Sequence, residues 1–96
     1  MLASAVLARA HLFISGNVQG VGFRYFVLRK ARDIGVSGWV RNREDGGVEA
    51  VVEGDQVLVE KVIYHCERGP MPAKVSGVKV SWEEKLEGFS TFSIRY

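Results

Sequence analysis

The stretch ARAHLFISGNVQGVGFRYFVLRKARDIG, residues 8–35, changes its hydrophobic period once, and this change decides the fold. Over residues 8–15 apolar and polar residues alternate, which is typical of a half-buried strand. From residue 23 onward the apolar residues follow the three-and-four spacing of an amphipathic helix: Phe23, Phe26, Val27, Ala31 and Ile34. Gly35 ends this predicted helix, because glycine readily adopts the left-handed conformation of a helix C-terminus. The stretch therefore predicts a strand, a glycine-rich loop and a helix.

The remaining elements follow from the same two periods. Residues 38–42 (GWVRN) and 47–54 (GVEAVVEG) read as two strands around the turn residues EDGG. Asp55 is a plausible N-cap for a second helix, which ends before GPMP and carries one apolar face: Val59, Val62, Ile63 and Cys66. VKVSW and FSIRY then read as alternating strands.

The predicted order is β-α-β-β-α-β with one additional short C-terminal strand. Such a chain most simply forms an α+β, ferredoxin-like split βαβ sandwich. We expect an antiparallel sheet with two helices on one face, because right-handed crossovers bring both helices to the same side. Residues 8–96 would form this domain, preceded by a short N-terminal extension of residues 1–7.

Composition restricts the class of protein and its compartment. A chain of 96 residues with 47% hydrophobic and 25% charged residues is typical of one globular domain. A net charge of +2, from 13 basic and 11 acidic residues, excludes a polybasic nucleic-acid footprint. Cys66 is the single cysteine, so an intrachain disulfide is excluded and a cytoplasmic location is expected. The opening MLASAVLA lacks the basic region of a secretory signal, and no apolar run is long enough to span a membrane.

The glycine-rich segment GNVQGVGFR, residues 16–24, reads as an anion site. It contains no proline, so each residue from Gln19 to Arg24 offers a backbone N–H beside a helix N-terminus. In the first helical turn, the positive charge of Arg24 interacts unfavourably with the positive end of the helix dipole. An anion bound at this point would compensate, because it would form a charge-assisted contact with the arginine. A glycine-rich turn followed by a solvated arginine remains the alternative. The segment has neither the G-x-G-x-x-G spacing nor the Gly-Lys-Ser/Thr of a nucleotide loop.

Asn42 is the second candidate functional residue. In GWVRN it points to the same face as Val40, so it would lie at a strand end on the helix-covered side of the sheet. A split βαβ fold can bring that strand end close to the start of the first helix. An asparagine that caps the turn beside REDGG is the competing interpretation.

GNVQGVGFR followed by GWVRN and GGVEAVVEG closely resembles the two signature segments of the acylphosphatase family, over residues 8–96. The resemblance implies hydrolysis of acyl phosphates to a carboxylate and inorganic phosphate, with phosphate as product and inhibitor. It implies no cofactor and no metal. It also implies that Arg24 and loop amides bind phosphate while Asn42 orients the attacking water. The phosphate-binding residues would be Gln19, Gly20, Val21, Gly22, Phe23 and Arg24.

Other catalytic readings are weaker. HCERGP resembles the start of a cysteine-phosphatase signature, but Pro72 stands where an arginine is required, so we expect Cys66 to pack in the core. His11 lies on the face opposite Ala10 and Leu12 and is expected at the surface. Arg29, Lys30 and Arg32 read as a solvated helix edge rather than a nucleic-acid patch, and the aromatic pattern of RNA-binding sheets is absent.

Two further functions remain open at this point. The first is a ligand-binding or regulatory module that retains the acylphosphatase fold. The family resemblance implies this alternative, because such domains also occur attached to larger proteins, including carbamoyl-transferring maturation factors. The second is a nucleic-acid binder. Because Arg24 and Asn42 are both present, we expect an enzyme that acts as a monomer on a small acyl phosphate, without nucleic-acid or membrane partners.

Overall fold

The computed structural model describes residues 6–96. Of the expected N-terminal extension, residues 1–7, the first five residues lie outside the described residues. The first strand begins at Leu7. The elements in chain order are β1 (Leu7–Asn17), α1 (Phe23–Ile34), β2 (Ser37–Asn42), β3 (Val48–Asp55), α2 (Gln56–Arg68), β4 (Lys74–Glu83) and β5 (Phe92–Ile94).

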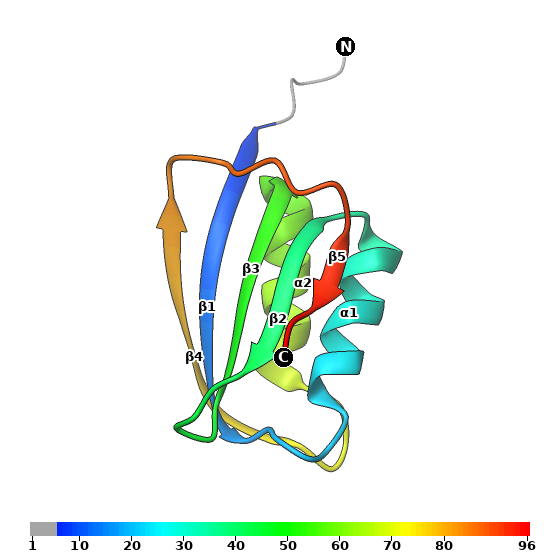
Figure 1. Cartoon of the computed structure of the whole chain (residues 1–96), viewed down its shortest axis with the longest axis vertical. Coiled ribbons are helices and arrows are strands. Elements are labelled where there is room, and N and C mark those ends of the chain that lie inside the picture. Colours follow the sequence, from blue (N-terminus) through cyan, green and yellow to red (C-terminus); the bar gives the residue numbers. More distant parts are fainter. Residues whose placement is uncertain (1–5) are drawn as a thin grey trace.

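The strands form one five-stranded sheet in the order β4-β1-β3-β2-β5, and both helices cover the same face (Figure 1). The first four strands in this order pair antiparallel, which gives the expected ferredoxin-like split βαβ arrangement. β5 differs from the expected antiparallel sheet because it runs parallel to β2, so the sheet is mixed. The segment after β4 crosses the end of the sheet at which β2 begins, and β5 therefore enters in the same direction as β2 (Figure 1).

The two helices begin in different ways. The Asp55 side chain caps α2 by accepting a hydrogen bond of 3.0 Å from the backbone N–H of Val57. α1 has Gly22 at its N-cap, with a φ of 76°, and no side chain among residues 6–96 caps it. Gly35 ends α1 in the left-handed conformation, and its N–H donates to the carbonyl of Ala31 as a C-cap. The start of α1 is thus left open to an external acceptor.

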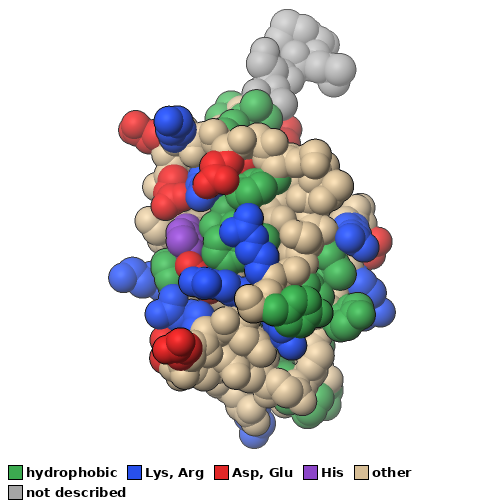
Figure 2. All heavy atoms as spheres, viewed as in Figure 1, with side chains coloured by type: hydrophobic (Ala, Val, Ile, Leu, Met, Phe, Trp, Pro, Cys, Tyr) green, Lys and Arg blue, Asp and Glu red, His purple; other side chains and the backbone are tan. Residues whose placement is uncertain are grey.

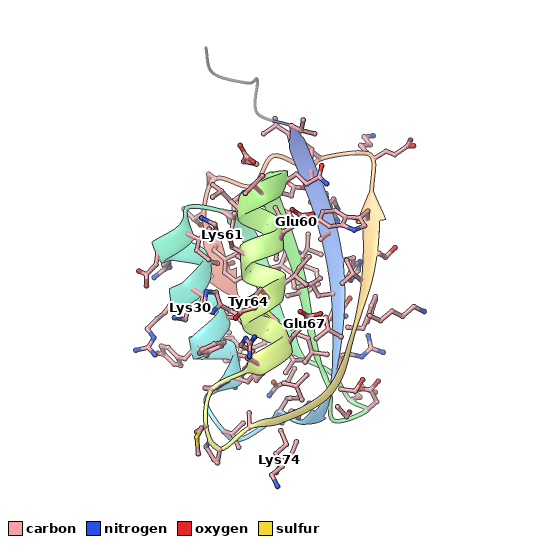
Figure 3. The ribbon with its side chains drawn as sticks, turned by 180° about the vertical axis from the view of Figure 1, so that it is seen from behind. Lys30, Glu60, Lys61, Tyr64, Glu67 and Lys74 are labelled. Atoms are coloured by element: carbon pink, nitrogen blue, oxygen red, sulfur yellow. The ribbon has the colours of Figure 1, made fainter. Side chains whose placement is uncertain are left out.

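The core lies between the sheet and the helices. Leu12 and Ile14 of β1 pack there with Val27 of α1, and none of these three side chains is more than 1% exposed. Phe23 is also buried at the first position of α1, and burying such a side chain stabilises the fold by about 1.5–3 kcal/mol. The outer helix faces carry polar and charged residues, among them the labelled Glu60, Tyr64 and Glu67 of α2 (Figure 3).

The other face of the sheet is covered by ion pairs rather than by helices. Arg9 contacts Glu53 at 2.8 Å across the β1–β3 ladder and also pairs with Glu83. His11 and Arg41 both pair with the buried Glu49, the arginine at 2.8 Å. These opposite charges lie interleaved over the sheet (Figure 2), so this face is not a one-sign surface. None of the described helices has the length and apolarity needed to cross a membrane.

Candidate active site

A pocket of about 90 Å³ lies where the segment between β1 and α1 meets the end of β2. We call residues 18–22, which join β1 to α1, the glycine loop. The pocket is lined by the glycine loop, the first turn of α1, the last residue of β2 and the chain after β5: Val18, Gly20, Gly22, Phe23, Arg24, Tyr25, Asn42, Ile94 and Tyr96.

Backbone donors are the first feature of this pocket. Among residues 6–96, the N–H groups of residues 19–25 have no hydrogen-bond acceptor, and the first α1 bond runs from Phe26 N–H to the Gly22 carbonyl at 3.0 Å. Gly20 and Gly22 have φ values of 72° and 76°, which side-chain-bearing residues rarely adopt. Unsatisfied N–H groups at the positive end of a helix dipole form a site for an anion.

Arg24 adds a full positive charge to these donors. It lies in the first turn of α1, and no ion pair within the described part of the chain includes it. Its guanidinium Cζ lies over the ring of Tyr96, 5.1 Å from the ring centroid. A cation without an acidic partner, beside unsatisfied amides, is complementary to a phosphate-sized anion.

Asn42 lies on the helix-covered face, as expected from its register with the fully buried Val40. Its Oδ1 is buried and accepts no hydrogen bond from any residue of the described chain. The turn-capping interpretation is wrong, because the turn is closed by Asp45, whose Oδ1 accepts from the N–H of Gly47 at 2.9 Å. Asn42 thus presents a buried, unpartnered acceptor in the pocket that contains Arg24.

The structure separates the expected phosphate-binding residues into two groups. Gly20, Gly22, Phe23 and Arg24 line the pocket, whereas Gln19 and Val21 do not. The Gln19 side chain instead donates to the backbone carbonyls of Arg43 and Gly47, at 2.7 and 2.8 Å. Val21 packs against the hydrophobic core. Only the backbone N–H groups of these two residues remain available to an anion.

Sequence reasoning missed four residues of the pocket: Val18, Tyr25, Ile94 and Tyr96. Tyr25 and Tyr96 are both exposed, at 66% and 98%, and flank Arg24 in the lining. Tyr25 adjoins Arg24 in sequence and could have been suspected. Tyr96 carries no sequence signal, because its place depends on the parallel pairing of β5 with β2.

The structure does not support a cysteine nucleophile at Cys66. Cys66 is 1% exposed in the core, and burial, with a smaller contribution from Glu67, raises the pKa of its thiol to about 12. A thiolate nucleophile is therefore absent at neutral pH. No cluster of three or more His, Cys, Asp and Glu side chains suited to a metal ion occurs among residues 6–96.

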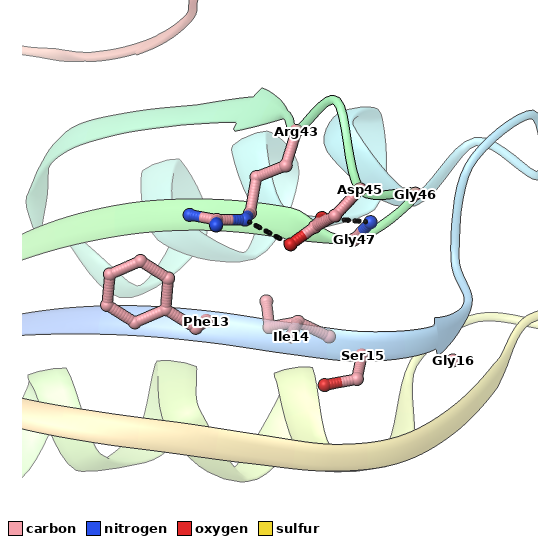
Figure 4. A pocket seen from close by; sticks show the side chains of 8 residues that line it. All are labelled: Phe13, Ile14, Ser15, Gly16, Arg43, Asp45, Gly46 and Gly47. Carbon is pink, nitrogen blue, oxygen red and sulfur yellow. Dashed lines mark hydrogen bonds and ion pairs between the residues drawn. The ribbon is translucent and has the colours of Figure 1, made fainter.

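A larger pocket of about 270 Å³ lies beside the β2–β3 hairpin (Figure 4). Its lining includes Phe13 and Ser15 of β1 and Arg43 and Asp45 of the hairpin. The Arg43 Nε donates to the Asp45 carboxylate at 3.0 Å, so the cation in this pocket is already neutralised. The smaller pocket is the candidate functional site, since it holds an arginine and an Asn42 oxygen that have no ion-pair or hydrogen-bond partner among residues 6–96.

Comparison with known proteins shows the family of this chain. The chain is a small α+β domain in which a glycine-rich loop leads into a helix whose N-terminal N–H groups have no acceptor among residues 6–96, an arrangement suited to anions. Residues 10–94 match the family model for acylphosphatase. The chain belongs to the acylphosphatase family, and it is a hydrolase. It is 54% identical over 89 residues to an acylphosphatase of Moorella thermoacetica, covering 93% of this chain and 95% of that one.

Solved structures give the same family and fold. The crystal structure of acylphosphatase from Bacillus subtilis superposes with a TM-score of 0.90 at 38% identity, covering 95% of this chain and all of that one. A full-length HypF, solved in a phosphate- and nucleotide-bound form, matches with a TM-score of 0.85 at 26% identity. The match covers 98% of this chain but 12% of that chain, so the fold also occurs as a small part of a larger protein.

Proposed function

We propose that this acylphosphatase-family enzyme hydrolyses the carboxyl–phosphate bond of small acyl phosphates through Arg24, the glycine-loop amides and Asn42. One observation carries the proposal: a buried acceptor without a partner, Asn42 Oδ1, lines the same pocket as an unpaired arginine. An anion held by the arginine and the amides would have a water-binding oxygen beside it.

The glycine-loop amides and Arg24 hold the phosphoryl group. Phosphoryl transfer requires mainly positioning and stabilisation of the charge on the three equatorial oxygens. The free N–H groups of residues 19–25 and the guanidinium supply fixed donors for those oxygens. Since these donors are already oriented in the fold, they need little reorganisation during the reaction.

Asn42 holds the attacking water. Its Oδ1 accepts a hydrogen bond from the water and places it in line with the bond that breaks. The water oxygen bonds to phosphorus as the bond from phosphorus to the carboxylate oxygen breaks, and the carboxylate leaves with the electron pair. One water proton passes to a phosphate oxygen, so the products are a carboxylate and dihydrogen phosphate.

The leaving group removes the need for a side-chain acid. A carboxylate whose conjugate acid has a pKa of about 4 departs unprotonated at neutral pH. The titratable side chains in the pocket lining are those of Arg24, Tyr25 and Tyr96, and the proposed reaction uses neither a general acid nor a metal. An alkoxide leaving group would need that acid, so the site favours acyl phosphates over alkyl phosphate esters.

The proposed enzyme acts as a cytoplasmic monomer, with residues 8–96 as its catalytic domain and without nucleic-acid or membrane partners. The single, buried Cys66 is compatible with a reducing compartment. The interleaved ion pairs on the uncovered sheet face argue against a nucleic-acid surface.

The test is hydrolysis of benzoyl phosphate, measured with and without a chelator and beside an alkyl phosphate. We expect turnover of benzoyl phosphate that chelator leaves unchanged, competitive inhibition by inorganic phosphate, and little turnover of the alkyl ester. Activity that is lost with chelator and restored by a divalent ion would refute the mechanism. Binding of phosphate without any turnover would instead support a ligand-binding or regulatory module.

A further inference from the structure

Gln19 connects the two halves of the site. Its side-chain nitrogen donates to the Arg43 carbonyl at 2.7 Å and to the Gly47 carbonyl at 2.8 Å, so both amide hydrogens are used. Its backbone belongs to the glycine loop, while both acceptors belong to the β2–β3 hairpin. Among residues 6–96 these are the only side-chain hydrogen bonds between the glycine loop and the rest of the fold.

The two acceptors lie at the neck of the hairpin, directly beside Asn42. Asn42 pairs with Val48 as the last residue pair of the β2–β3 ladder. The next pair outward is Arg43 with Gly47, joined by a bond of 2.9 Å from the Arg43 N–H to the Gly47 carbonyl. Gln19 therefore contacts the backbone one residue beyond Asn42 on one strand and one residue before Val48 on the other.

The turn of the hairpin is closed by its own hydrogen bonds. Asp45 accepts hydrogen bonds from the Gly47 N–H at 2.9 Å and from Arg43 Nε at 3.0 Å (Figure 4). The Arg43–Gly47 pair that Gln19 contacts directly follows the Asn42–Val48 pair, so a displacement of the first pair would act on the backbone of Asn42.

The glycine loop contains Gly20 and Gly22, and its Val18 and Val21 side chains pack in or against the core. Among residues 6–96, its only side-chain hydrogen bonds are those of Gln19, which join it to the hairpin.

We propose that the Gln19 side chain is a positioning residue that sets the distance between the phosphate held by the glycine loop and the water held by Asn42. This inference rests on the proposed roles of the glycine loop and Asn42. The side chain does not contact substrate, because its nitrogen is committed to the two carbonyls. It acts through the placement of Asn42.

The test is Gln19→Met, which keeps the length of the side chain and removes both donors. We expect kcat for benzoyl phosphate to fall about 10- to 100-fold, the cost of a small misplacement of reacting groups. The inhibition constant of inorganic phosphate should change less than about threefold, since Arg24 and the amides remain. Gln56→Met is the matched control: Gln56 starts α2, its side chain makes no hydrogen bond in the described chain, and kcat should be unchanged.

A double-mutant cycle with Asn42→Ala separates positioning from general weakening of the fold. If Gln19 acts through Asn42, Gln19→Met should cost less than about threefold in kcat once Asn42 has been removed. Equal losses in both backgrounds would overturn the proposal. Full activity of Gln19→Met beside a damaged Asn42→Ala would overturn it too, whereas full activity of Asn42→Ala would overturn the proposed function itself.

A second variant covers the case in which Gln19→Met does not fold. Gln19→Asn keeps the amide but is one methylene too short to reach both carbonyls, so it should show the same loss in kcat and the same coupling to Asn42. Circular dichroism and thermal unfolding establish folding for each variant. If neither variant folds, Gln19 is a structural residue and the positioning role is wrong.

Discussion

The guanidinium of Arg24 lies 5.1 Å from the ring centroid of Tyr96, so the second residue after β5 contacts the arginine in the first turn of α1. Both residues line the proposed phosphate pocket. The ring contacts the guanidinium without neutralising its charge, whereas a carboxylate would neutralise it. An unneutralised, oriented cation is suited to an incoming anion.

Removal of this ring is expected to weaken phosphate binding slightly. Tyr96→Ala should raise the inhibition constant of inorganic phosphate about two- to fivefold, because a cation–π contact at an exposed site contributes about 0.5–1 kcal/mol. Tyr96→Phe should behave as the parent chain, since the ring is retained. Tyr64→Ala removes a comparable contact with Arg68 on the outer face of α2 and should leave inhibition unchanged. An equal effect of both alanine variants would contradict a specific role of Tyr96.

Arg24→Ala is expected to abolish turnover and to weaken inhibition by phosphate, because the arginine contacts the phosphoryl group in both the ground state and the transition state. Arg24→Lys should restore little, since a point charge does not reproduce the planar fork of the guanidinium. The measurements are kcat and the phosphate inhibition constant for benzoyl phosphate hydrolysis. Arg29→Ala, an exposed arginine of the same helix, is the control and should remain active. Tight phosphate inhibition of folded Arg24→Ala would show that the arginine does not bind the anion.

Asn42→Ala is expected to lower kcat about 100-fold or more while changing phosphate inhibition less than about twofold. The side chain holds the water, so its loss removes positioning of the nucleophile and leaves the anion site intact. Asn17→Ala, at the exposed end of β1, is the matched control and should keep its activity. Normal turnover of folded Asn42→Ala would mean that the unpartnered oxygen does not act in catalysis.

Cys66→Ser is expected to retain most of its activity and to lower the free energy of unfolding by about 1–3 kcal/mol, because a hydroxyl would replace a thiol at a buried site. Burial raises the pKa of this thiol to about 12, so the native protein should also resist alkylation at neutral pH. The measurements are benzoyl phosphate turnover, urea unfolding and labelling by iodoacetamide. An inactive but folded Cys66→Ser protein would revive the cysteine-phosphatase mechanism.

The Arg9–Glu53 pair is expected to make stability depend on acid pH. Burial by itself would raise the pKa of Glu53, but hydrogen bonds from the Glu87 N–H and from Arg9 outweigh it, and the pKa lies below its usual value of 4.5. A carboxyl with a lowered pKa in the folded state stabilises the protein above pH 4.5, and this contribution is lost as the pH falls through the lowered value.

Arg9→Met should therefore cost about 2–4 kcal/mol at pH 7, because it leaves buried Glu53 without its cation. The difference from the parent chain should be smaller at pH 3 than at pH 7, because the pH then falls toward the lowered pKa of Glu53 and a smaller fraction of the carboxyl is charged. Urea unfolding at the two pH values measures this, with the exposed Arg29→Met as control. A difference that stays constant with pH would assign the loss to packing of the arginine stem instead.

The local elements could be predicted from the sequence because their causes are local. The shift of period between residues 15 and 23, the stop at Gly35 and the cap at Asp55 depend on residues a few positions apart, and all three are confirmed. The ferredoxin-like fold class follows from their order, and the glycine loop and Arg24 stand out by their composition. The parallel pairing of β5 did not follow, because it depends on the path of the segment after β4 across the end of the sheet.

The sequence by itself determined which residues could do chemistry, while only the tertiary structure decided which groups meet. Asn42 is compatible with a turn cap or a water ligand in sequence, and the choice depends on whether its buried Oδ1 has a partner. The role of the Gln19 side chain could not be predicted, because its acceptors are backbone carbonyls, which every residue possesses. Tyr96 meets Arg24 only because β5 pairs with β2. Contacts between distant segments depend on the packed fold, so no local pattern of residue types encodes them.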